Sequence, residues 1–369
     1  AAASRWSANI GDVAASNHQV VHLDGRRLGF GELAADAAKL PLPDLAQLPL
    51  KEPKDFRYIG KDIPIVDLQD MCTGNTLFGT DVRIPGMLFA SIDRTPVLQG
   101  KVLSFDRDAT LKAPGVVDVI RIKGQPLPSG FNALEGVAVL ASDSYSAITG
   151  RSKLNISWDR GVHATHNSGA YLDDLAAKVS AVPGKIARER GDTDAALGKA
   201  TTIVEATYLT PYLAHAPMEP PAATAHIHDG ICEIWACTQT PQQTQQTVAA
   251  ILGIDNKAVK VHVTLLGGGF GRKSKPDFSV EAALLARETG KPVQVTWTRE
   301  DDIRNDYFHS CSAQYYKGGL DDSGKLTAWL AREATPPISS IFQAGANIQN
   351  DASLSQSFGS IPFAVENLR

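Results

Sequence analysis

Apolar and polar residues alternate in the second half of the chain in a way that predicts half-buried strands. Val259, Val261 and Val263 are each followed by a polar residue, which is the period of two expected of a strand with one buried face. Short runs at 231–235 and 292–297 are rich in β-branched and aromatic residues and predict two further strands.

Helix signals separate these strands. Thr240 precedes Pro241, a pair typical of an N-cap and a first helical position, and Gly253 predicts the end of that helix. A second helix is expected over 275–289, where Gly290 follows as a stop signal. This mixture of strands and helices favours an α+β architecture.

The first half of the chain predicts a compact β-rich unit over residues 71–160. Its apolar runs are short, β-branched and bounded by Pro or Gly, as is typical of strands. The expected elements are strands within 81–90, 114–120, 136–140 and 153–158, a short helix over 142–150, and a weaker helix within 168–188.

Ahead of this unit, residues 1–33 combine a turn at Asp24-Gly25 with short apolar segments. Residues 41–64 are rich in Pro and Lys, which predicts an extended connector. The expected organisation is an N-terminal segment with its connector over 1–70, the β-rich unit over 71–160 and a further domain over 165–369.

Composition narrows the class of protein. The 369 residues are 43% hydrophobic and 21% charged, with a net charge of −4 and no long run of one sign. A globular chain is therefore expected, without nucleic acid as a partner. No apolar stretch approaches the roughly 18 residues that a membrane span needs.

None of Cys72, Cys232, Cys237 and Cys311 forms a CxxC pair, so neither a disulfide framework nor an iron–sulfur cluster is expected on this chain.

The most informative stretch is the glycine run from Leu266 to Ser274, between a predicted strand and a predicted helix. Consecutive glycines let a ligand approach main-chain N–H groups closely, and a following helix N-terminus favours anions. Arg272 and Lys273 add positive charge. An anionic cofactor is a candidate ligand, and a glycine-rich turn without any ligand is the alternative.

Common nucleotide-binding motifs do not fit this run. Arg272 separates Gly271 from Lys273, which breaks the Gly-Lys-Ser of a P-loop. The same arginine stands three residues after Gly269, where the dinucleotide fingerprint requires glycine. A nucleotide-dependent enzyme is therefore disfavoured.

Gln239 is a second candidate, because it ends a predicted strand directly before a predicted helix. Its amide can both donate and accept hydrogen bonds, and a strand terminus can project it into a cleft. A capping or surface role is the common alternative.

Four blocks in this order resemble the molybdopterin-binding subunit of the xanthine dehydrogenase family, and more narrowly its isoquinoline 1-oxidoreductase beta-subunit and bacterial aldehyde dehydrogenase branch. The blocks are Ala214–Pro220, Trp235–Gln239, Leu266–Lys273 and Trp297–Asp302. Residues 71–160 resemble the family's α/β hammerhead domain. Residues from about 165 resemble part of its first molybdenum-cofactor-binding domain.

The resemblance implies roles for particular residues. Gln239 matches a glutamine that hydrogen-bonds an oxygen ligand of molybdenum. The main-chain amides of the glycine loop match those beside the metal's other oxygen ligand, and the metal itself is held by the pterin. The implied cofactor-binding residues are Gln239, Gly268, Gly269, Phe270, Gly271 and Arg272.

Ser274 stands where purine-oxidising members carry a substrate-facing glutamate, so an aldehyde or an N-heterocycle is the expected substrate. The alternative is that Ser274 is the N-cap of the next helix. The family's general base is a glutamate late in the subunit, and this chain ends at Arg369 before that region. We therefore expect a partial chain that is inactive by itself, and we assign no catalytic residue. Glu219 and Glu281 are interpreted as structural.

The resemblance further implies a molybdenum–molybdopterin cytosine dinucleotide cofactor and hydroxylation with water as the oxygen source. Electrons would leave through a separate subunit with two iron–sulfur clusters, joined in some systems by a c-type cytochrome. The alternative is a non-catalytic cofactor-binding module that lacks the base. Relatives are often exported from the bacterial cytoplasm, but the sequence does not specify a compartment.

Histidines suggest one further site. His215 and Glu219 are four residues apart, and His226 and His228 follow. Metal ligation is disfavoured, because Pro217 prevents the first two from sharing a helical face. No GxSxG motif of a serine hydrolase is present.

Overall fold

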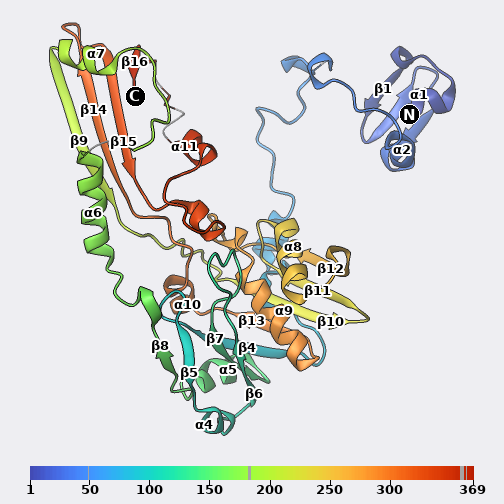
Figure 1. Ribbon diagram of the computed structural model, residues 1–369. Coiled ribbons are helices and arrows are strands. Elements are labelled where there is room, and N and C mark those ends of the chain that lie inside the picture. Colours follow the sequence, from blue (N-terminus) through green and yellow to red (C-terminus); the bar gives the residue numbers. More distant parts are fainter. Residues whose placement is uncertain (49, 182–183, 358–360, 363) are drawn as a thin grey trace. The chain divides into compact units, whose positions relative to one another are not determined.

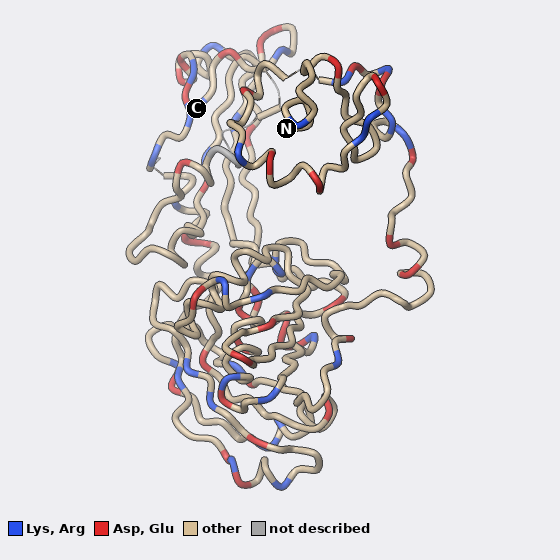
Figure 2. The backbone as a smooth tube through the Cα atoms, turned by 90° about the vertical axis from the view of Figure 1, so that its right-hand side faces the viewer, with Lys and Arg blue, Asp and Glu red and all other residues tan. Residues whose placement is uncertain are grey.

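The computed structural model describes residues 1–48, 50–181, 184–357, 361–362 and 364–369. The chain divides into two units, Ala1–Thr73 and Gly74–Arg369, and each is described by itself (Figure 1). Acidic and basic residues are interspersed along both units, in keeping with the small net charge (Figure 2). Among the described residues, no helix is both long enough and apolar enough to cross a membrane.

The first unit contains a small antiparallel sheet of order β1-β2-β3 beside a short helix. Gly25 turns the chain between the second and third strands with φ +94°, so the predicted turn at Asp24-Gly25 is confirmed. The elements of this unit are α1 (Ala2–Trp6), η1 (Ile10–Asp12), β1 (Val13–Ser16), β2 (Gln19–His22), β3 (Arg27–Gly29), α2 (Phe30–Ala37), η2 (Leu45–Gln47), η3 (Pro53–Asp55) and α3 (Leu68–Thr73).

The second unit is built on a seven-stranded sheet of order β12-β11-β10-β13-β4-β7-β6. Two of its neighbour pairs are parallel, β11 with β12 and β13 with β4, and the others are antiparallel. Its strands are β4 (Leu88–Arg94), β6 (Val116–Ile122), β7 (Gly136–Ala141), β10 (Ala222–His228), β11 (Ile231–Ala236), β12 (Val259–Val263) and β13 (Val293–Thr296). Strands from 71–160 and from 165–369 therefore share one sheet, joined where β4 pairs with β13.

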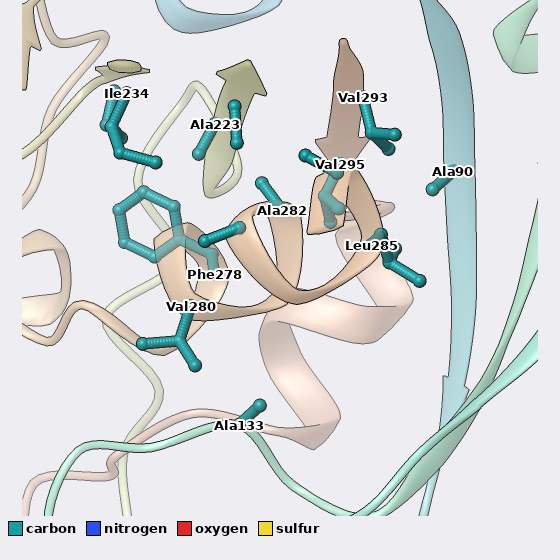
Figure 3. Close-up of a cluster of buried hydrophobic side chains, with 14 of the residues drawn as sticks. Ala90, Ala133, Ala223, Ile234, Phe278, Val280, Ala282, Leu285, Val293 and Val295 are labelled. Atoms are coloured by element: carbon teal, nitrogen blue, oxygen red, sulfur yellow. The ribbon is translucent and has the colours of Figure 1, made fainter. Parts of the chain in front are cut away.

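Helices cover both faces of this sheet. Helix α9 (Asp277–Thr289) is buried almost all round over its first ten residues, where Asp277, Ser279 and Glu281 are buried together with the apolar residues. Figure 3 shows Phe278 and Leu285 turned toward the strands, while Val280 points the other way, toward Ala133. Phe278, Val280 and Leu285 are fully buried, and the burial of each side chain contributes about 1.5–3 kcal/mol to the stability of the fold.

Small residues allow α9 to approach the sheet. Strand β10 carries Ala223 and Ala225 on the face toward α9, where larger side chains would hold the helix away. On strand β7, Ala138 and Leu140 join the core beneath α9, whereas alternate residues join a second cluster on the opposite face. The other helices of this layered region are α4 (Arg107–Leu111), α5 (Ser144–Arg151), α8 (Pro241–Leu252) and α10 (Arg299–Arg304).

A separate four-stranded sheet of order β16-β15-β14-β9 lies in the same unit, with α6 and α7 packed against it. A two-stranded sheet pairs β5 with β8. The remaining elements are η4 (Gly79–Asp81), β5 (Lys101–Ser104), β8 (Ser157–Asp159), η5 (Gly161–His163), α6 (Ser168–Ser180), α7 (Thr193–Lys199), β9 (Thr202–Thr210), η6 (Asn256–Ala258), η7 (Arg272–Ser274), β14 (Ser312–Leu320), β15 (Leu326–Ala334), η8 (Ile338–Ile341), α11 (Asp351–Ser357) and β16 (Asn367–Leu368).

The mixed α and β character predicted from the sequence is present, with several sheets. The helix predicted between Thr240 and Gly253 is confirmed, and both Gly253 and Gly290 end their helices in the left-handed conformation. The strand predicted within 81–90 begins only at Leu88, because a 3₁₀ turn and a Pro-Gly turn occupy the residues before it. The strand predicted within 153–158 is confined to 157–159.

Candidate functional site

Parallel pairing brings the two predicted site segments together. Strands β11 and β12 run side by side in register, with Ala236 opposite Val263. Their carboxyl ends therefore lie at one edge of the sheet, where ligands of open α/β sheets are commonly bound. Gln239 follows the first strand and the glycine loop, residues 266–271, follows the second.

Gln239 lies directly against the glycine loop. Gly271 donates its main-chain N–H to Oε1 of Gln239 at 3.0 Å, and the N–H of Gln239 donates to the carbonyl of Lys273 at 2.9 Å. A Cβ atom added to Gly269 would stand 2.6 Å from Oε1 of Gln239. Glycine is thus required at position 269 for the glutamine to keep this position.

The loop presents several unused hydrogen-bond donors. In the described part of the chain, the amides of Gly268, Gly269 and Phe270 and the side-chain Nε2 of Gln239 have no protein acceptor. The main-chain amide of Gly271 was expected to face the ligand like the others in the loop. It donates its hydrogen bond to Gln239 instead.

The backbone of the loop is held in unusual conformations. Gly268, Phe270 and Gly271 have φ values of +87°, +52° and +102°. For Phe270, which has a Cβ, the left-handed conformation costs about 1–2 kcal/mol. Its ring lies over Gly268 and is 68% exposed. An exposed aromatic ring on a strained residue is the kind of feature found at ligand-binding loops.

Glu219 fixes the loop from inside the protein. Its carboxylate accepts hydrogen bonds from the N–H of Gly79 at 2.8 Å, from the N–H of Gly267 at 3.0 Å and from Nζ of Lys273 at 2.7 Å. A Cβ on Gly267 would meet the Cβ of Glu219 at 2.5 Å. These contacts support the structural interpretation of Glu219, and they place the charge of Lys273 inside the protein.

Arg272, which was expected to add positive charge for an anionic ligand, is also buried. Its guanidinium forms two hydrogen bonds to Asp277, at 2.9 and 2.8 Å, and lies 3.1 Å from Asp306. Burial alone would lower the pKa of Arg272, but the two carboxylates outweigh it and hold that pKa above its ordinary value. The side chain therefore ties the loop to the start of α9, and its predicted part in cofactor binding stays a prediction.

Ser274 lies on the loop at a turn. Its Oγ donates to the carbonyl of Gly271 at 2.6 Å and accepts from Nζ of Lys275 at 2.7 Å. The alternative that Ser274 caps the next helix is wrong, because α9 begins at Asp277 with Pro276 in the N-cap position. The substrate-side role of Ser274 stays a prediction.

His215 belongs to this site in a way that the sequence did not indicate. Its Nδ1 lies 2.8 Å from Oδ2 of Asp306, whose same oxygen accepts the main-chain N–H of His215 at 2.6 Å. The centre of the ring lies 4.4 Å from that of His309, with the two rings tilted by 35°, and the ring lies next to Gly271. Asp306 stands outside all four family-like blocks, so no motif pointed to it.

The remaining candidates lie apart. His228 on β10 forms a 2.9 Å hydrogen bond with Glu233 on β11. It is not hydrogen-bonded to His215 or Glu219. No group of three or more metal-binding side chains is brought together within the described ranges. Glu281 forms two 2.6 Å hydrogen bonds with Arg94 inside the core, in keeping with its structural interpretation.

A model of the molybdopterin cofactor-binding domain matches residues 178–333, a range that contains Gln239 and the whole glycine loop. This part of the chain is similar to molybdopterin cofactor-binding domains. The resemblance drawn from the four sequence blocks is thereby confirmed.

Curated relatives of this molybdopterin cofactor-binding domain are oxidoreductases. The chain is 31% identical over 309 residues to isoquinoline 1-oxidoreductase subunit beta of Brevundimonas diminuta, covering 79% of this chain and 38% of that protein. It is 31% identical over 319 residues to a membrane-bound aldehyde dehydrogenase (pyrroloquinoline-quinone) of Gluconacetobacter polyoxogenes, covering 84% and 40%. The chain thus spans about two fifths of the length of these relatives.

Solved structures share the fold of most of this chain. Aldehyde oxidoreductase from Desulfovibrio gigas superposes with a TM-score of 0.66 at 21% identity, over 87% of this chain and 39% of that one. Quinoline 2-oxidoreductase from Pseudomonas putida 86 superposes with a TM-score of 0.60 at 20% identity, over 76% and 40%.

Proposed function

We propose that this chain is part of the large subunit of a molybdenum hydroxylase that oxidises an aldehyde or an N-heterocycle, with water as the oxygen source. The names of the relatives support both substrate classes, since they include aldehyde dehydrogenases and oxidoreductases of isoquinoline and nicotinate. Within this proposal, residues 71–160 form an α/β hammerhead domain and residues 165–369 belong to the first cofactor-binding domain.

One observation carries the proposal: unpaired donors from two segments converge beside the loop. Nε2 of Gln239 is held there because Oε1 of the same side chain accepts from Gly271. The amides of Gly268, Gly269 and Phe270 are the other donors, and no described residue accepts from them. Fixed N–H donors stabilise anionic oxygen without having to reorganise, so this cradle fits an oxyanion-bearing cofactor.

The cofactor, when bound, would supply the two-electron oxidation chemistry. The chain's own residues would orient it: Gln239 and the three free amides bind its anionic oxygens, while Glu219 and Lys273 hold the loop in place from behind. Phe270 stands exposed at the loop tip, where its ring can exclude water from the bound group.

We further propose that the cofactor is the cytosine dinucleotide form and that electrons leave through a separate subunit with two iron–sulfur clusters, joined in some systems by a c-type cytochrome. Two buried thiols of this chain, Cys232 and Cys237, are unsuited to cluster ligation, which requires thiolates. Burial raises the pKa of Cys232 to about 12 and that of Cys237 to about 11.

The test is to produce the chain in a host that makes the molybdenum cofactor and to measure molybdenum per chain. Dye reduction by an aldehyde is measured on the full-length subunit with its partner, because the general base is expected outside this chain. We expect bound molybdenum, and about tenfold weaker retention in Gln239→Ala, because a donor to the cofactor is lost. Gln246→Ala, on the exposed side of helix α8, is the matched control and should retain the metal.

The alternative function is a non-catalytic cofactor-binding module. Bound molybdenum without any dye reduction by the full-length subunit with its partner would favour that module over the enzyme. Absence of molybdenum from the wild-type chain would contradict both functions.

A further inference from the structure

Lys275 carries a half-buried positive charge beside the glycine loop. Its Nζ donates to Oγ of Ser274 at 2.7 Å and lies 4.8 Å from the centre of the Phe131 ring. Within the described part of the chain, no carboxylate lies within 4 Å of this Nζ. The neighbouring Lys273 shows the usual arrangement, because its buried Nζ is paired with Glu219 at 2.7 Å.

The protein compensates the charge of Lys275 incompletely. Burial lowers the pKa of Lys275, and the nearby guanidinium of Arg272 lowers it further. The carboxylates of Asp277 and Asp306 act in the opposite direction, but both are engaged with Arg272. An anion that reached Lys275 would remove this imbalance.

The ring of Phe131, which the ammonium contacts, belongs to a cluster of aromatic side chains. The Phe131 ring meets Tyr307 at 5.1 Å and Phe342 at 4.8 Å, both edge to face. The segments that carry Phe131 and Phe342 are joined by a hydrogen bond from the N–H of Gly130 to the carbonyl of Ile341 at 2.9 Å. Phe342 is 53% exposed, so it offers an apolar surface next to Phe131.

Two hydrogen bonds of Ser274 connect this cluster to the glycine loop. The cluster consists of Phe131, Ser274, Lys275, Tyr307 and Phe342. Oγ of Ser274 accepts from Lys275 and donates to the carbonyl of Gly271, the residue that also orients Gln239. A group bound at Lys275 would therefore lie beside the loop and its free amides.

We propose that Lys275, with the rings of Phe131 and Phe342, recognises the carboxylate of an aromatic substrate. This inference names the substrate class of the site and rests on the molybdenum hydroxylase function proposed above. The ammonium binds the carboxylate more strongly than it would in open water because it is partly desolvated, and the rings pack against the aromatic body of the substrate.

The experiment compares two ligands of equal shape, benzoate and benzamide, in ligand-observed NMR titrations of the purified chain. We expect benzoate to bind about tenfold more tightly than benzamide, as a charge-assisted contact allows. In Lys275→Met the side-chain length is kept and the charge is lost, so both ligands should bind equally weakly. Lys291→Met is the matched control, since Lys291 is exposed and forms no ion pair within the described ranges.

Equal affinities for benzoate and benzamide in the wild-type chain would overturn the proposal, and this comparison does not depend on whether a variant folds. Preferential binding of pyrophosphate over benzoate, abolished in Lys275→Met, would also overturn it, because the site would then serve a phosphate of the cofactor. Since these titrations need no molybdenum, a failure here is distinguishable from the absence of molybdenum that would contradict the proposed function.

Discussion

Gly269 lies against Gln239 so closely that no other residue fits without moving the glutamine. A Cβ at position 269 would stand 2.6 Å from Oε1 and 2.9 Å from Cδ of Gln239. The obstructing atoms belong to the end of a flexible, exposed side chain. This contact therefore couples the shape of the glycine loop to the orientation of the amide, and it can be perturbed without disturbing the core.

Gly269→Ala is predicted to separate cofactor binding from folding. Because Gln239 can rotate away, we expect the free energy of unfolding to change by no more than about 1 kcal/mol. Molybdenum retention should fall by about tenfold, because Gln239 loses its hydrogen bond to Gly271. Thermal unfolding and metal analysis measure the two effects. Gly198→Ala, on a helix position with open space, is the control, and equal retention in both variants would count against the loop as the binding site.

Glu219→Gln is predicted to destabilise the protein strongly. The substitution leaves the ammonium of Lys273, whose side chain is 0% exposed, without its counter-charge. Removing one partner of a buried ion pair costs about 3–5 kcal/mol. Urea denaturation followed by fluorescence measures this loss.

The double variant Glu219→Gln with Lys273→Met provides the control for that prediction. It removes both charges, while glutamine still offers one oxygen to the amides of Gly79 and Gly267. We expect it to regain a large part of the lost stability. A double variant less stable than Glu219→Gln alone would show that the pair does not act through charge.

His228 is predicted to make the stability of the protein depend on pH. Hydrogen bonds to Glu233, and secondarily to Asp229, raise the pKa of His228 above its ordinary value of 6.5. The folded chain thus holds this proton more tightly than the unfolded chain. The resulting stability is fully present below about pH 6.5 and is lost as the pH rises through the folded pKa.

The carboxyl of Glu233, the partner of His228, sets the lower pH limit of this stabilisation. His228 and, secondarily, His262 lower the pKa of Glu233 below 4.5, so its contribution is present above that value and is lost as the pH falls through its folded pKa. We expect His228→Gln to lower the melting temperature more at pH 5.5 than at pH 8.5. A melting-temperature difference that is the same at both values would show that the pair is not charged in the folded state.

Several local features could be predicted from the sequence because they depend on neighbours along the chain. Pro241 and Gly253 bound a helix through the geometry of their own backbone, and Gly290 ends the next helix for the same reason. The alternation of Val259, Val261 and Val263 identified strand β12.

The strands that were not predicted lack such local signals. Strand β14 contains Gly318 and Gly319 in its interior, which weakens any strand pattern. Strand β10 begins with alanines, whose small size matters only because α9 packs on them. Their assignment to strands follows from long-range pairing and packing, which no local window contains.

The sequence by itself determined the order of the family-like blocks, the ends of the helices and the residue types of the loop, since each depends on composition and local spacing. Only the tertiary structure decided that Gln239 meets Gly271, because that contact requires β11 and β12 to pair in parallel. It also decided that Arg272 is buried whereas Lys275 is left without a carboxylate partner among the described residues. Burial and charge pairing arise when distant segments pack together, so identical lysines or arginines along a chain acquire different roles in the fold.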